Sequence, residues 1–273
     1  MTFWALLSAL VLLHNAGELL GAQVRSSIVD GKDAEPNNWK WMAYLKFMNE
    51  DKEKWGCGAT IVSKYWVMSA ASCWKRKSAP VLRKTVLTVG LIDLQNEADQ
   101  FIGIDRNPQI HGVADLALFH TTDPIQMNAK VGLISLPTKD NFGASSLCWI
   151  MGWGDVRKGT PLKKPQKLQQ RQISIISKKD CKDKRPGLGS NMLCAEDYAC
   201  DGDYGGPLVC KADNTLVQVG IMSSGSCDPN GLPGVYTRVY EYRSWINAYI
   251  NQDTETEMHQ RGSNGSLAAG FTP

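Results

Sequence analysis

Histidine is scarce in this chain of 273 residues, and its scarcity limits the acid–base chemistry that the chain can perform. Histidine is the side chain that most often serves as a general base near neutral pH. The chain has four, at His14, His111, His120 and His259. His111 lies four residues before Asp115, in an expected surface loop, so it is either a general base or a solvated loop histidine. His120 is expected at a strand end and His259 in a polar tail, and neither is a candidate base.

Eight cysteines follow an expected signal peptide, and their even number predicts disulfides formed in an oxidising compartment. They are Cys57, Cys73, Cys148, Cys181, Cys194, Cys200, Cys210 and Cys227. Spacing alone leaves the pairing open. Metal binding is the competing use, but no Cys-x-x-Cys pair exists and no histidine lies beside a cysteine pair. Glu97 and Asp99 offer two carboxylates where calcium takes about six to eight oxygens. We therefore expect no metal and no cofactor.

Both ends of the chain carry signals of their own. Residues 1–22 read as a secretory signal, because the apolar run Phe3–Leu13 is too short to span a bilayer and small residues follow it. A buried N-terminal helix is the alternative. No later run is long enough to cross a membrane. Residues 23–27 are a short pro-like segment, and residues 251–273 form a polar tail that we expect to be disordered. Asn264 begins a glycosylation triplet in that tail. We expect a secreted protein.

The charge balance excludes some partners. Thirty basic residues against 27 acidic ones give a net charge of +3, which makes no case for a nucleic-acid binder. Basic residues gather in residues 75–84, in 157–171 and in 178–185. These runs either bind sulfated glycans or are solvated loops, and we favour solvated loops because no aromatic interleaving organises them.

Residues 28–250 predict one all-β unit. Short apolar runs alternate with turn residues, as in a sandwich or a pair of barrels. The expected strands are Trp41–Phe47, Ala59–Val62, Trp66–Ala71, Val86–Val89, Leu116–Phe119, Leu147–Met151, Gln172–Ile176, Pro207–Val209, Leu216–Met222 and Val235–Val239. The spacing of Tyr242, Trp245, Ile246 and Tyr249 predicts an amphipathic helix over 240–252.

Several motifs occur together and in a fixed order. They are Ile28-Val29-Asp30-Gly31, Trp66-Val67-Met68-Ser69-Ala70-Ala71-Ser72-Cys73, Asp115-Leu116-Ala117-Leu118, Gly152-Trp153-Gly154, Cys200-Asp201-Gly202-Asp203-Tyr204-Gly205-Gly206-Pro207 and Pro233-Gly234-Val235-Tyr236. In this order they resemble the chymotrypsin/trypsin-like serine proteases (peptidase family S1). The resemblance implies two six-stranded antiparallel β-barrels followed by a C-terminal helix. It also implies the disulfides Cys57–Cys73, Cys148–Cys210, Cys181–Cys194 and Cys200–Cys227.

The same resemblance implies a catalytic triad, and two of its three positions are altered. Ser72 stands where the motif has histidine, Tyr204 where it has the nucleophilic serine, and Asp115 is retained. A serine hydroxyl is no general base near neutral pH, and a phenol with a pKa of about 10 stays protonated there. Without a nucleophile, His111 is better explained as a loop residue. The backbone N–H groups of Gly202 and Tyr204 remain as a possible oxyanion hole. We therefore expect that this protein is not an enzyme.

Activation and specificity positions also depart from the family. Active members free an amine at the Ile28 position, which pairs with the aspartate found here as Asp203. Ser27 precedes Ile28, and the nearest basic residue is Arg25, so we expect a single-chain, zymogen-like state. Tyr198 falls at the base of the specificity pocket, where it either fills the pocket or merely packs. The walls would be Ser223, Ser224, Gly225 and Gly234.

Three functions remain open. The chain resembles the inactive serine proteases of mammalian testis, which favours a secreted homologue that binds an unknown protein partner. A protein that binds heparin or acidic surfaces is one alternative, and a weak serine-type endopeptidase is the other.

Overall fold

A computed structural model describes residues 31–35, 38–75, 79–96, 98–156, 158–196, 200, 202–225, 227–228 and 231–252. The expected signal peptide, the pro-like segment with Ile28, the C-terminal tail with Asn264, and Tyr198 lie outside these residues. No helix within the described residues is long and apolar enough to cross a membrane.

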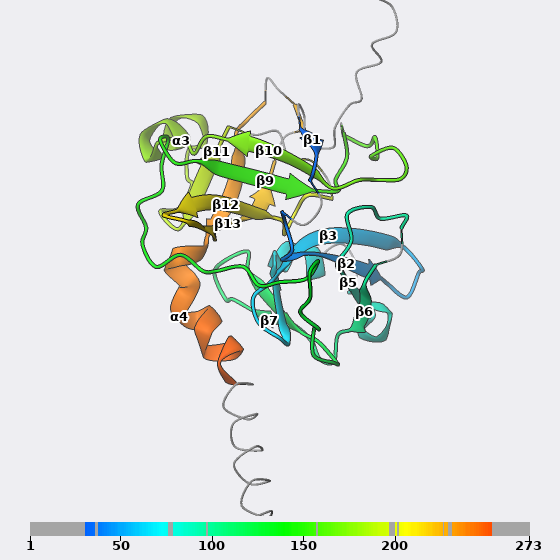
Figure 1. Cartoon of the computed structure of the whole chain (residues 1–273). Coiled ribbons are helices and arrows are strands. Elements are labelled where there is room, and N and C mark those ends of the chain that lie inside the picture. Colours follow the sequence, from blue (N-terminus) through cyan, green and yellow to red (C-terminus); the bar gives the residue numbers. More distant parts are fainter. Residues whose placement is uncertain are drawn as a thin grey trace, which may run out of the picture.

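The N-terminal half of the chain forms a seven-stranded antiparallel sheet (Figure 1). Its order is β6 (Gln100–Gly103), β5 (Val86–Val89), β2 (Met42–Met48), β3 (Lys54–Ile61), β4 (Trp66–Ser69), β8 (Ala117–His120) and β7 (Gln109–Ile110). Ile104, just after β6, pairs with Thr121, just after β8. This pairing joins distant strands and closes the sheet into a barrel.

A second seven-stranded sheet lies above the first in Figure 1; it is formed by the C-terminal half of the chain, with the N-terminal strand β1 added at its edge. Its order is β1 (Lys32–Asp33), β10 (Gln169–Ile173), β9 (Cys148–Gly152), β12 (Pro207–Ala212), β13 (Thr215–Ser224), β14 (Gly234–Arg238) and β11 (Met192–Ala195). The antiparallel pairing of Ile175 with Ala195 closes this sheet in the same way. The expected all-β fold with two antiparallel barrels is confirmed. Each sheet has seven strands among the described residues rather than six, because short segments such as β1 and β7 add to the edges.

One expected strand is displaced. The sequence favoured a strand over 172–176, whereas β10 spans Gln169–Ile173. Its first two residues are polar but buried: Gln170 accepts a hydrogen bond from the Trp39 indole N–H at 2.5 Å, and Gln169 donates to Asp33 at 2.9 Å. Hydropathy places such residues outside a core strand, and their hydrogen bonds are what allow them inside.

Helices are short except at the C-terminus. They are α2 (Ala71–Trp74), the 3₁₀ turn Leu82–Lys84, α3 (Lys178–Lys184) and α4 (Val239–Ile250). The expected C-terminal helix is confirmed as α4, which leaves the second barrel and packs against the first. Tyr249 contacts Trp66 of β4 with ring centroids 5.7 Å apart. This contact fastens the two halves together.

Four disulfides hold the chain, and they join the pairs that the resemblance implied. They are Cys57–Cys73, Cys148–Cys210, Cys181–Cys194 and Cys200–Cys227. Cys148–Cys210 links the neighbouring strands β9 and β12. Cys57–Cys73 ties α2 to β3, and this bond fixes the segment that carries Ser72.

Candidate functional site

A pocket of about 250 Å³ opens where the two barrels meet. Its lining residues come from both halves of the chain: Cys57, Ser72 and Cys73 from the first barrel, and Tyr204 and Ser223 from the second. Backbone hydrogen bonds cross the same boundary, because Gly58 N–H donates to the Tyr204 carbonyl at 3.0 Å. The fold therefore brings two of the three altered or retained triad positions, Ser72 and Tyr204, to one pocket.

Asp115, the third of these positions, lies directly behind Ser72. The Ser72 N–H donates to Asp115 Oδ1 at 2.6 Å, and the Ser72 hydroxyl donates to Asp115 Oδ2 at 2.9 Å. Both carboxylate oxygens are thus engaged by one residue. Among the described residues, Asp115 makes no ion pair with a lysine, arginine or histidine.

A second chain of hydroxyls also ends on Asp115. Thr237 of β14 donates its hydroxyl to the Asp115 carbonyl at 3.1 Å, and Ser223 lies 3.0 Å from the Thr237 oxygen. Ser223 has a single hydroxyl hydrogen and two acceptors within reach: the Ile221 carbonyl at 3.4 Å and the Thr237 oxygen, whose own hydrogen goes to Asp115. The hydroxyl hydrogens of both pocket serines are therefore taken by partners within the protein, Asp115 for Ser72 and Ile221 or Thr237 for Ser223.

The turn that carries Tyr204 is fixed by its glycines. Gly202 and Gly205 have φ angles of +95° and +77°, a region that other residues rarely adopt. Gly205 has no room for a side chain, since a Cβ there would lie 2.5 Å from the Gly58 carbonyl oxygen. Gly205 N–H also donates to Met222 at 2.9 Å. The half-buried Tyr204 is consequently held at the pocket by backbone that cannot readily rearrange.

Asp203, beside Tyr204, is a buried carboxylate that is 3% exposed. It accepts hydrogen bonds from Gly154 N–H at 2.9 Å and Cys200 N–H at 3.0 Å. Gly154 must lack a side chain, because a Cβ would lie 2.5 Å from the Asp203 carboxyl carbon. Burial, together with the charges of Asp203 and Asp155, raises the pKa of Tyr44 to about 12. Because Ile28 lies outside the described residues, the single-chain state stays a prediction.

Comparison with known proteins identifies the scaffold. Residues 28–246 match the family model described as Trypsin. The chain belongs to the trypsin family. It is 34% identical over 251 residues to a mouse protein named Tryptase, covering 85% of this chain and 92% of that one. It is 31% identical to mouse Serine protease 28, covering 82% and 89%, and 30% identical to human Serine protease 41, covering 85% and 79%. A trypsin-family domain with four disulfides is consistent with an extracellular protein.

His111 is not a free loop residue of this trypsin-family domain. It is half-buried and contacts α4 edge-on, with ring centroids 4.6 Å from Tyr242 and 5.2 Å from Trp245. Its Nδ1 accepts a hydrogen bond from the Val113 N–H at 3.4 Å. His111 lies in a loop, as expected, but it is half-buried rather than fully solvated: the ring packs on the C-terminal helix, and it is not among the described residues that line the pocket.

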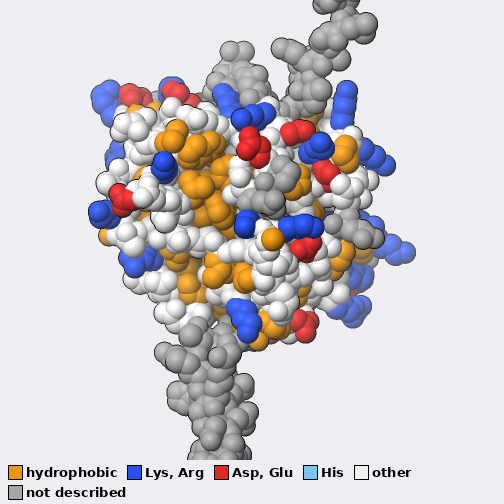
Figure 2. All heavy atoms as spheres, in the orientation of Figure 1, with side chains coloured by type: hydrophobic (Ala, Val, Ile, Leu, Met, Phe, Trp, Pro, Cys, Tyr) orange, Lys and Arg blue, Asp and Glu red, His pale blue; other side chains and the backbone are white. Residues whose placement is uncertain are grey.

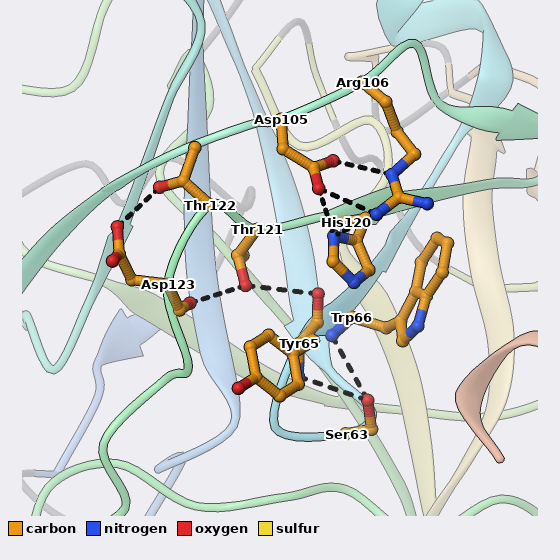
Figure 3. Close-up of polar contacts among 9 residues, drawn as sticks. All are labelled: Ser63, Tyr65, Trp66, Asp105, Arg106, His120, Thr121, Thr122 and Asp123. Carbon is orange, nitrogen blue, oxygen red and sulfur yellow. Dashed lines mark hydrogen bonds and ion pairs between the residues drawn. The ribbon is translucent and has the colours of Figure 1, made fainter. Parts of the chain in front are cut away.

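His120 lies at the end of β8, as expected, and is buried there (Figure 3). Its Nδ1 lies 2.7 Å from Asp105, which Arg106 also contacts at 2.8 Å. Tyr65 stacks on the imidazole, and Trp66 contacts it edge-on. Burial acts to raise the pKa of Asp105, but the hydrogen bond from Arg106 and the charge and hydrogen bond of His120 outweigh it, so this pKa is lowered. Nothing in the sequence pattern singled out this pair, since its members are fifteen residues apart.

The residues expected to form the walls of the specificity pocket do not all line the pocket between the barrels. Gly234 begins β14 opposite Ala195, and Gly225 follows β13, while Ser223 alone of the expected walls lines the pocket. Thr237 was missed altogether, because only the three-dimensional structure shows its contact with Asp115. Tyr198 lies outside the described residues.

Basic side chains are spread rather than gathered. On the face drawn in Figure 2, Lys and Arg lie both at the rim and near the centre, interspersed with Asp and Glu. Lys167 pairs with Asp33 at 3.6 Å and Lys179 with Asp183 at 3.0 Å. Lys163 and Lys164 are exposed. The described parts of the basic runs are thus partly neutralised by the fold.

Proposed function

We propose that this chain is a secreted trypsin-family protein that hydrolyses no peptide bonds and acts by binding a protein partner. One observation carries the proposal: at the pocket between the barrels, Ser72 gives both of its hydrogen-bond donors to Asp115. The group beside the retained carboxylate is therefore a hydroxyl, and not an imidazole that can accept a proton.

Proton transfer is the step that this arrangement lacks. Attack on an amide needs a nucleophile whose proton is removed as the new bond forms. Tyr204 carries a phenol, and a phenol in water has a pKa of about 10 and keeps its proton near neutral pH unless a base takes it. Ser72 cannot take it, because a serine hydroxyl has no basicity in this range. Loss of a triad costs roughly a million-fold in turnover, and oxyanion stabilisation alone leaves about 10³–10⁴ over water.

The retained scaffold supports a binding role. Both barrels close, all four disulfides are present, and the glycines that shape the turn around Tyr204 are kept. The pocket remains open between the barrels. A protein that keeps this pocket but lacks a general base can still bind a partner there, although it cannot cleave a peptide bond. The secretion included in this proposal is supported by the signal-like sequence of residues 1–22 and by the four disulfides.

The names of the relatives favour a second candidate, a weak serine-type endopeptidase. Mouse Tryptase and the two serine proteases carry protease names, and the present chain matches most of their length. Binding to sulfated glycans has weaker support. Lys163 and Lys164 are exposed, but Lys167 of the same basic run is already paired with Asp33.

An activity series separates the binding protein from the enzyme. The parent chain, a Tyr204→Phe variant and the double variant Ser72→His/Tyr204→Ser are assayed with a broad set of peptide and ester substrates. Each is prepared with residues 23–27 replaced by a specific cleavage site, so that the Ile28 amine can be freed. We expect no turnover above the Tyr204→Phe control for the parent. The double variant should exceed the parent by at least about 10³-fold, because it restores the nucleophile and its base.

The activity assay and a heparin column together distinguish the three candidate functions. Ordinary turnover by the parent that disappears in Tyr204→Phe would establish an enzyme and overturn the proposal. An inactive parent with an active double variant supports an intact scaffold that has lost its chemistry. Retention of the parent on heparin above physiological salt would instead support glycan binding, because weak surface attraction is screened at that ionic strength.

A further inference from the structure

The walls of the pocket between the barrels present hydrogen-bond acceptors. Ser72 donates its only hydroxyl hydrogen to Asp115, and the hydrogen of Ser223 is taken within the protein by the Ile221 carbonyl or the Thr237 oxygen. A hydroxyl that has spent its hydrogen keeps lone pairs that accept. The oxygens of Ser72 and Ser223 are therefore oriented to receive N–H or O–H donors from a molecule in the pocket.

Negative charge stands directly behind these acceptors. The Asp115 carboxylate is 2.9 Å from the Ser72 oxygen, and it makes no ion pair within the described part of the chain. A hydrogen bond donated to a carboxylate polarises the donor hydroxyl, so the Ser72 oxygen becomes a stronger acceptor. A cation in the pocket would compensate the charge, whereas an anion would be repelled by it.

The third component is an aromatic wall. Tyr204 lines the same pocket, and aromatic faces attract cations that lie within about 6 Å of the ring. A planar guanidinium suits this combination better than an ammonium: it carries five N–H donors, stacks on rings and is more weakly hydrated. The volume of about 250 Å³ accommodates such a head group together with a few waters, each occupying about 30 Å³ in the liquid.

We propose that this pocket binds the guanidinium group of an arginine side chain on the partner protein, with Asp115 supplying the charge and Ser72 and Ser223 the acceptors. The inference rests on the proposed binding function and names the chemistry of its partner. It differs from recognition at the base of a specificity pocket, because the charge comes from Asp115 and not from position 198, where the chain has Tyr198.

Ligand-observed NMR titration of the full secreted chain tests it with two probes, N-acetyl-arginine amide and its neutral isostere N-acetyl-citrulline amide. We expect the arginine probe to bind at least about tenfold more tightly at low salt, a difference that salt reduces. Asp115→Asn should remove this preference. Asp183→Asn is the matched control, because it also removes one carboxylate but lies on α3, where it pairs only with Lys179 among the described residues.

A second variant retains the Asp115 carboxylate, so the inference can still be tested if Asp115→Asn fails to fold. Ser72→Arg places a tethered guanidinium beside Asp115, so it should block the arginine probe while thermal unfolding shows a folded protein. Equal affinity for the two probes, or an unchanged preference in Asp115→Asn and Ser72→Arg, would overturn the inference.

Chromatography of the probe after each titration separates the two proposals. An intact probe that does not bind removes the arginine site and leaves the proposed function standing. A probe whose amide has been hydrolysed by the parent chain removes the proposed function itself.

Discussion

Two aspartates lie near opposite ends of strand β8, and they differ in their surroundings. One lies beside the pocket without a histidine, and the other contacts a histidine away from the pocket. Asp115 precedes the strand and contacts Ser72 at the pocket, without an imidazole. Asp105 contacts His120, the last residue of the strand, at 2.7 Å. From position 115 to position 120 the chain runs roughly 16 Å, at about 3.3 Å per residue. The molecule thus contains an aspartate–histidine pair, but at the wrong end of β8 for the pocket.

The comparison shows that an aspartate–histidine pair is not by itself a catalytic device. The His120 ring stacks on Tyr65 and contacts Trp66 edge-on, and it is 8% exposed (Figure 3). This packing makes the pair a structural element of the first barrel. A general base also needs a nucleophile within about 2.6–3.2 Å. Conversely, the Asp115 site has the pocket and the access but no proton acceptor.

The largest expected difference between the two aspartates is in rate. In the active Ser72→His/Tyr204→Ser background, Asp115→Asn should lower kcat by about 10⁴-fold, because the new histidine loses the carboxylate that sets its tautomer. Asp105→Asn in the same background should change kcat by less than about twofold, since this carboxylate touches neither the pocket nor its residues. Steady-state kinetics at 25 °C measure both. Similar losses for the two variants would contradict the assignment of separate roles.

Stability should respond in the opposite order. His120→Ala removes a buried ring that contacts two aromatic neighbours and leaves Asp105 with Arg106 alone, so we expect a loss of about 2–4 kcal/mol in the free energy of unfolding. Urea denaturation with the disulfides intact measures it. His111→Ala is the matched control, because that ring is only half-buried and should cost less. A smaller loss at His120 than at His111 would show that the Asp105–His120 pair does not stabilise the barrel.

The sequence predicted most of the site around Asp115 but nothing of the pair formed by Asp105 and His120. The motifs around Ser72, Asp115 and Tyr204 are local, and the fold they implied brings these residues together. The implied cysteine pairs occur, and α4 follows from its apolar spacing. The strand over 169–173 was misplaced because buried glutamines carry no hydropathy signal.

The Asp105–His120 pair illustrates what sequence patterns omit. Its residues lie in no motif, and they meet only because the segment after β6 closes the barrel against the end of β8, where Asp105 N–H donates to the His120 carbonyl at 3.2 Å. The direction of the Ser72 and Ser223 hydroxyls is likewise invisible in one dimension. The Ser72 hydroxyl is directed by Asp115, which is 43 residues away, and the Ser223 hydroxyl by Ile221 and Thr237.

The lowered pKa of Asp105 predicts a pH dependence. Burial acts against it, but Arg106 and His120 favour the ionised carboxylate in the folded state. Its stabilisation is therefore complete above the unfolded-state pKa of about 3.9 and is lost as the pH falls through the lower folded-state value. Asp105→Asn should cost about 1–2 kcal/mol at pH 7 and progressively less below pH about 4. Denaturation of both proteins between these pH values measures the difference, with the exposed Asp183→Asn as the control for charge. A constant difference at all pH values would contradict the role of the charge.

Ser72→Ala should give the smallest effect. Its hydroxyl bond to Asp115 lies at an exposed residue, where such bonds contribute about 0.5 kcal/mol. The backbone N–H bond to Asp115 Oδ1 survives the substitution, so the position of α2 should not change. Urea denaturation beside His120→Ala measures the contrast directly: one aspartate contact lies at an exposed residue of the pocket, and the other is part of the core. A loss above about 2 kcal/mol for Ser72→Ala would show instead that the hydroxyl is needed to fold the pocket, because only buried and well-partnered polar groups reach that size.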